Sequence, residues 1–103
     1  MGWIFLALAI LLEVAGTTAM KLSDGLTRPG YAVTMFVLYA LAFAALALSI
    51  RTVALGVAYA VWAGVGTALI AGIAAVWFGE PLGATKVASI GLIVAGVAGL
   101  HLA

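Results

Sequence analysis

The 103-residue chain contains no cysteine, one histidine, and only three acidic and four basic residues. Without cysteine it forms no disulfide and offers no thiolate to a metal or a substrate. Charged residues make up 7% of the sequence, whereas a soluble domain has about 25%, so the chain could not cover a surface that faces water. The four scattered basic residues form no patch for nucleic acid. We expect no nucleic-acid partner, no metal and no cofactor.

Apolar residues dominate instead, at 68% of the chain. Short polar breaks divide them into four runs, at about 2–20, 31–50, 54–78 and 84–102. About 20 apolar residues cross the hydrocarbon core as a helix, and a helix satisfies its own backbone hydrogen bonds in lipid. The sequence therefore predicts an all-α integral membrane protein, a four-transmembrane-helix bundle forming one domain over 1–103. Because the loops are short, we expect successive helices to be antiparallel neighbours.

The orientation of the chain in the membrane is only weakly encoded. Lys21, Arg28 and Lys86 lie at one end of the predicted helices, and Arg51 lies at the other. The end richer in basic residues is expected to face the cytoplasm. We expect a multi-pass protein of the cell (inner) membrane.

Glu13 stands inside the first apolar run, about halfway through the membrane. A carboxyl group at that depth costs at least ~2.5 kcal/mol on insertion scales and is a functional-site hypothesis by default. Lys21 is about 12 Å further along the helix axis, and the other basic residues lie in or near loops. A structural ion pair therefore lacks a partner, and we expect Glu13 to hold a proton, a polar group or a cation from outside. The charge also argues against a cleaved secretion signal.

Several residues are placed to share a site with Glu13. Gly16 and Thr17 lie on the same helix face, where the Thr17 hydroxyl could serve the site or bond back to a carbonyl of its own helix. Tyr59 and Trp62 share a face of the third run, and Trp62 lies too deep for an interfacial belt. Aromatic faces attract cations. Tyr39 lies about midway along the second run, whereas Phe43 there has the pattern of a core or lipid-facing residue.

Small residues suggest two further roles. Gly64 and Gly66 lie two and four residues after Trp62 and serve either as hinges or as packing positions. In the fourth run, Ser89, Gly91 and Gly96 stand at spacings typical of a contact surface between helices. We assign that run to assembly and not to chemistry.

Three motifs give the chain a family resemblance: Glu-Val-Ala-Gly-Thr-Thr from Glu13, Gly-Val-Ala-Tyr-Ala-Val-Trp from Gly56, and Gly-Leu-Ile-Val-Ala-Gly-Val from Gly91. The chain resembles the small multidrug resistance transporters, four-helix proton-coupled exporters of cationic compounds. The resemblance implies that Glu13 binds protons and substrate alternately. It also implies an antiparallel dimer with contacts from the fourth helix. The implied site-lining aromatics are Tyr39, Tyr59 and Trp62, with Trp3 where some members carry Tyr.

Within that family, the Gly16-Thr17-Thr18 run resembles the quaternary-ammonium exporters, whereas guanidinium exporters tend to carry a bulky Trp nearby. Ala42 departs from the pattern, because many members have Ser there. We expect a transporter and not an enzyme: a homodimeric proton antiporter that exports lipophilic or quaternary-ammonium cations by alternating access, with proton and cation competing for Glu13.

Three alternatives stay open at this point. The first is a guanidinium-type exporter with the same fold. The second is one subunit of a paired transporter. The third is a proton-carrying subunit of a larger complex, like a rotor-ring proteolipid, which has no use for Tyr59 and Trp62 at depth.

Overall fold

The computed structural model describes residues 1–102, and of His101 only the backbone. The described chain forms the four helices α1 (Gly2–Leu22), α2 (Pro29–Ser49), α3 (Leu55–Val76) and α4 (Ala84–Leu102). The predicted all-α fold is confirmed. The helix ends differ from the predicted runs by one or two residues. For example, α2 begins at Pro29 because proline is favoured in the first turn of a helix, where its missing N–H costs nothing.

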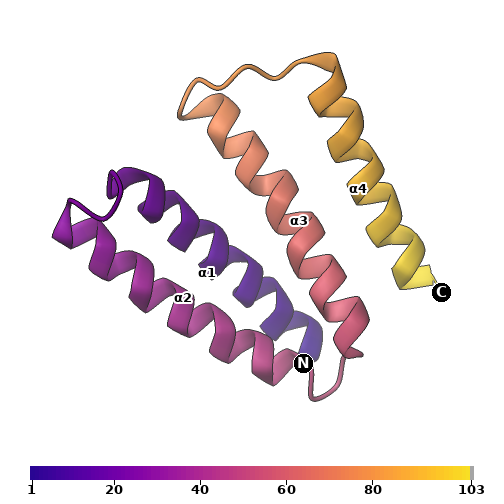
Figure 1. The fold of residues 1–103 in the computed structure, drawn as a ribbon. Helices are drawn as coiled ribbons and strands as arrows, with labels where there is room; N and C mark the ends of the chain where they lie inside the picture. The colour runs from indigo at the N-terminus through magenta and orange to yellow at the C-terminus, as the bar shows by residue number, and fades with distance from the viewer. Residues whose placement is uncertain (103) are drawn as a thin grey trace.

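The helices lie roughly in one layer, with overall dimensions of 42 × 35 × 16 Å. Helix α1 lies between α2 and α3, and α4 packs on the outer side of α3 (Figure 1). The expectation of successive neighbours holds for α1 with α2 and for α3 with α4. It is wrong for most of the length of α2 and α3, because α3 packs against α1 on one side and α4 on the other. The single chain is therefore an open layer, with one face of α4 uncovered.

Two buried serines end the first two helices. Ser23 and Ser49 are fully buried, and their hydroxyls donate to the carbonyls of Met20 and Leu46, each at 2.7 Å. Such bonds satisfy polar groups that would otherwise be costly in apolar surroundings. The core cluster between α1 and α3 is made of the apolar residues Leu6, Ile10, Val14, Val53 and Ala58.

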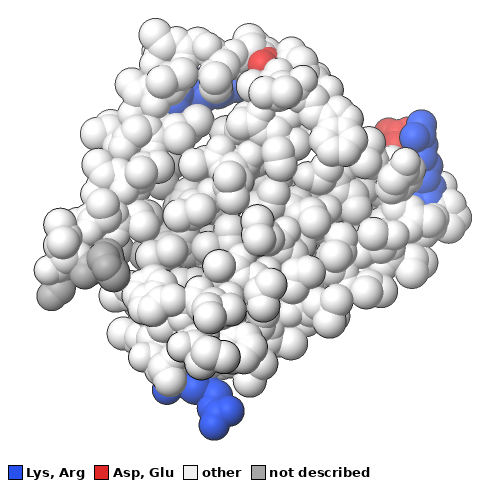
Figure 2. Space-filling model, turned by 180° about the vertical axis from the view of Figure 1, so that it is seen from behind, with Lys and Arg blue, Asp and Glu red and all other residues white. Residues whose placement is uncertain are grey.

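The distribution of apolar and charged residues fits a protein that crosses the membrane several times. Helices α1, α2 and α3 are long and apolar enough to span a bilayer, and α4 adds a shorter apolar stretch, Ala84–Leu100. In the view of Figure 2, Lys, Arg, Asp and Glu appear only at the extremities of the molecule, with an uncharged band between them. Glu13 is the one charged residue of the sequence well inside a helix.

Candidate functional site

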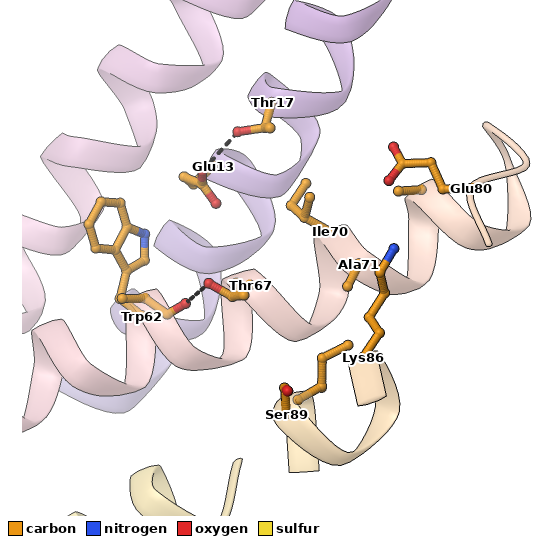
Figure 3. Close-up of a pocket in the computed structure, with 13 residues that line it drawn as sticks. Glu13, Thr17, Trp62, Thr67, Ile70, Ala71, Glu80, Lys86 and Ser89 are labelled. Carbon is orange, nitrogen blue, oxygen red and sulfur yellow. Dashed lines mark hydrogen bonds between the residues drawn. The ribbon is translucent and has the colours of Figure 1, made fainter. Parts of the chain in front are cut away.

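A cavity of about 640 Å³ opens between α1, α3 and the beginning of α4 (Figure 3). Helix α1 contributes Glu13 and Thr17, and α3 contributes a wall that runs from Trp62 to Ala74. The loop after α3 and the first turns of α4 close the far end with Glu80, Lys86, Ser89 and Ile90. The cavity therefore runs from the middle of the bundle to the end that carries the α3–α4 loop.

The Glu13 carboxylate is held by a short chain of hydroxyl groups. Thr17 Oγ1 donates to Glu13 Oε1 at 2.8 Å and lies 2.6 Å from the hydroxyl of Tyr39 on α2. A threonine hydroxyl has one proton to give, so Tyr39 is the donor to Thr17. The Thr17 hydroxyl therefore bonds to Glu13 and not to a carbonyl of its own helix. It is Thr18 that donates back to a helix carbonyl, that of Val14, at 2.9 Å.

Two glycines allow these groups to come together. A Cβ at Gly16 would lie 2.7 Å from the Tyr39 ring, so only glycine lets the ring lie against α1. A Cβ at Gly66 would lie 3.3 Å from Glu13 Oε2, closer than most real contacts of this kind. Gly16 therefore makes room for Tyr39, and Gly66 makes room for the carboxylate on the facing helix.

Glu13 has no basic partner among the described side chains. No lysine or arginine nitrogen of this part of the chain lies within ion-pair distance of its carboxylate, whose hydrogen-bond partner is the neutral Thr17. The described residues also contain no group of three or more His, Cys, Asp or Glu that could hold a metal ion. A half-buried carboxylate with a neutral partner leaves its negative charge available to a proton or to a bound cation.

Aromatic rings hold Trp62 at the inner end of the cavity. Its ring is edge-to-face with Tyr59, at a centroid distance of 5.3 Å, and with Phe43 of α2, at 5.6 Å. The buried indole nitrogen has no hydrogen-bond partner in the described structure, and Figure 3 shows the indole beside Glu13. Phe43, expected from the sequence to be a core or lipid-facing residue, is 55% exposed and does not line the cavity, although its ring meets Trp62.

The other predicted residues occupy different places. Trp3 is 47% exposed in the first turn of α1 and does not line the cavity. Helix α3 is continuous through Gly64, where an added Cβ would collide with Val97 of α4. Packing therefore explains Gly64, and the hinge role of Gly64 and Gly66 stays a prediction.

The residues assigned to assembly divide into two groups. Gly91 and Gly96 are exposed, and no neighbouring atom of the described structure lies within 4 Å of a Cβ added at either, so neither packs against another described helix of the single chain. Ser89, in contrast, lines the cavity, and its hydroxyl donates to the carbonyl of Thr85 at 2.8 Å.

Three polar residues of the cavity were not predicted from the sequence. Thr67 lies one helical turn beyond Ala63 and donates to its carbonyl at 2.6 Å. Glu80 and Lys86 lie at the far end of the cavity. The sequence shows that Glu80 and Lys86 lie beside a turn, but it does not indicate that this turn folds back over α3.

Comparison with known proteins gives a consistent picture. The sequence model described as "Small Multidrug Resistance protein" matches residues 1–93. The chain is 46% identical to the quaternary ammonium compound-resistance protein QacF of Klebsiella aerogenes, over 98% of this chain and 92% of that protein. It is 47% identical to the multidrug resistance protein mmr of Mycolicibacterium paratuberculosis, over 99% of this chain and 96% of that protein. It is also 45% identical to the uncharacterized membrane protein YvaE of Bacillus subtilis, over 99% of this chain and 86% of that protein.

These matches cover nearly the whole chain and confirm the family that the three motifs indicated. They also exclude the rotor-ring alternative. The chain belongs to the Small Multidrug Resistance family of multi-pass membrane drug efflux transporters, which are not enzymes.

Proposed function

We propose that this chain exports lipophilic or quaternary-ammonium cations in exchange for protons, and that both compete for Glu13. The observation that carries the proposal is the half-buried Glu13 carboxylate, which lines a cavity and has, among the described side chains, only a hydroxyl partner. A carboxylate in apolar surroundings is costly unless it is protonated or paired. Either a proton or a cation relieves that cost, and the two exclude one another.

The cavity walls support an organic cation as the substrate. The aromatic ring of Trp62 lies beside the carboxylate, and most of the remaining lining is apolar, including Ile70, Ala71 and Ala74. Cation–π contacts and apolar walls suit a cation that is poorly hydrated. The relative QacF, named for resistance to quaternary ammonium compounds, favours this class over guanidinium.

Transport by the purified chain, reconstituted alone in vesicles, tests the proposal. An acidic lumen should drive uptake of external tetraphenylphosphonium, and collapse of the pH gradient should stop it. Glu13→Gln should abolish uptake, whereas the matched control Asp24→Asn, in the α1–α2 loop, should retain it. Uptake by Glu13→Gln at the wild-type rate would contradict the proposal, and guanidinium uptake far faster than that of tetraphenylphosphonium would overturn the substrate class.

The second half of the transporter is proposed to be another copy of the same chain, inserted in the opposite orientation in the cell (inner) membrane. One end of the helices carries the basic residues Lys21, Arg28 and Lys86, and the other end carries Arg51. Because this difference in basic charge is small, either orientation is accessible. A cysteine at Thr27 should be labelled in about half of the molecules by a reagent applied from one side of the membrane. Labelling of all or none would indicate a fixed orientation and would require a partner subunit.

A further inference from the structure

The cavity that holds Glu13 has a second carboxylate residue at its other end. Glu80, in the loop between α3 and α4, lines the same cavity of about 640 Å³ (Figure 3). The described residues place Glu80 in no ion pair. The proposed antiport at Glu13 does not require it, so the second acid needs its own explanation.

The backbone after α3 fixes the position of Glu80. Gly79 adopts φ +67°, a left-handed conformation that glycine takes without steric cost. This turn brings the backbone N–H groups of Phe78 and Glu80 onto the same carbonyl, that of Ala74, at 3.2 and 3.0 Å. Glu80 is therefore held over the last turn of α3, above the mouth of the cavity.

Helix stability does not account for the charges at this mouth. Glu80 follows the C-terminal end of α3 and Lys86 lies in the first turn of α4, so each lies at the helix end whose dipole disfavours its charge. Among the described residues the two charges form no ion pair with one another, and the Lys86 ammonium donates instead to the carbonyl of Pro81 at 2.9 Å. The Glu80 carboxylate is left exposed to whatever enters the cavity.

The spacing of the two acids follows from α3, which contacts both. Gly66 faces the Glu13 carboxylate, and Ala74 holds the backbone of Glu80. Eight residues of helix separate these two points, which is about 12 Å. Ile70, Ala71 and Ile90 line the cavity between them. The cavity is therefore an elongated, largely apolar slot with an acid at each end.

We propose that this slot binds elongated dications, with one positive charge at Glu13 and the other at Glu80, and an apolar linker along Ile70 and Ala71. This inference rests on the proposed function of Glu13 and narrows the substrate class of the same site. Lys86, at the mouth, opposes the second charge and so limits the preference for dications.

Binding of two matched probes to the purified full-length chain tests the inference. Octamethonium carries a trimethylammonium group at each end of an eight-methylene chain, and octyltrimethylammonium carries one. Titration calorimetry measures the octamethonium preference, which is the affinity for octamethonium divided by the affinity for octyltrimethylammonium. Glu80→Gln should lower the octamethonium preference about two- to fivefold, as expected for an exposed charge pair, and Lys86→Gln should raise it. Both effects should shrink in high salt, and Asp24→Asn should leave the ratio at its wild-type value.

The outcomes separate the two proposals. An unchanged ratio in Glu80→Gln, or equal weakening of both probes, would overturn the dication inference and leave antiport at Glu13 intact. A Glu13→Gln variant that binds octyltrimethylammonium as tightly as the wild type would instead overturn the proposed function.

Discussion

The hydroxyl of Tyr39 donates to Thr17 across the contact between α1 and α2, at 2.6 Å. Thr17 in turn donates a hydrogen bond to Glu13. Tyr39 on α2 therefore orients a carboxylate on α1 that it does not touch. Gly16 makes the arrangement possible by leaving room for the tyrosine ring. The site is therefore built by three helices, although its only acid in the membrane comes from one.

Removing the Tyr39 hydroxyl should disturb the carboxylate without removing any lining of the cavity. A neutral hydrogen bond contributes about 0.5–1.5 kcal/mol, so Tyr39→Phe should weaken tetraphenylphosphonium binding by about two- to tenfold. Thr17→Val should weaken it at least as much, and Thr17→Ser should restore it. If Thr17→Ser behaved like Thr17→Val, the hydroxyl chain would not be what positions Glu13.

The close approach of Glu13 to Gly66 gives a second prediction. Gly66→Val should push the carboxylate out of place and weaken cation binding by about tenfold or more, because displacements of 1 Å at a reacting group have effects of that size. Gly72→Val is the matched control on the same helix, since an added Cβ there meets no atom within 4 Å. Equal loss in both variants would indicate a general effect of valine on α3.

Trp62 should contribute directly to the binding of aromatic cations. Trp62→Ala should weaken tetraphenylphosphonium binding by about 1–2 kcal/mol, the size of a desolvated cation–π contact, and Trp62→Phe should lose less. Trp77→Ala is the control, because Trp77 is 62% exposed and stacks on Phe78 outside the cavity. A larger loss in Trp77→Ala than in Trp62→Ala would place the aromatic contact elsewhere.

Gly96 tests whether α4 is the helix that meets a second copy. Outside the backbone of its own helix, no described atom lies within 4 Å of a Cβ added at Gly96, so Gly96→Leu should leave the helical content of the protomer intact. A close contact between helices of two copies would not accommodate the leucine. We expect cross-linking in membranes to lose the dimer and vesicles to lose transport. Gly72→Leu, at another open position, should keep both, and a Gly96→Leu dimer of wild-type yield would exclude this contact.

The sequence predicts the helices well because each apolar run has the length that a bilayer requires. Glu13 was also predictable, as a single charge among apolar residues. The lateral order of the helices was not predictable from the sequence, because it depends on which helix faces pack together in three dimensions. For the same reason the sequence did not predict that Phe43 meets Trp62 across two helices, or that the turn at Gly79 places Glu80 over the cavity.

Proton release on cation binding tests the central claim, competition at Glu13, most directly. Tetraphenylphosphonium is added to the purified chain in a weakly buffered solution, and the released protons are measured across a range of pH. The wild type should release protons that saturate with cation binding, and the apparent affinity should fall as the pH is lowered, because protons occupy the same carboxylate. Asp24→Asn should behave like the wild type. Glu13→Gln should neither bind the cation nor release protons. Cation binding by Glu13→Gln at wild-type affinity, or wild-type binding without proton release at any pH, would contradict the account.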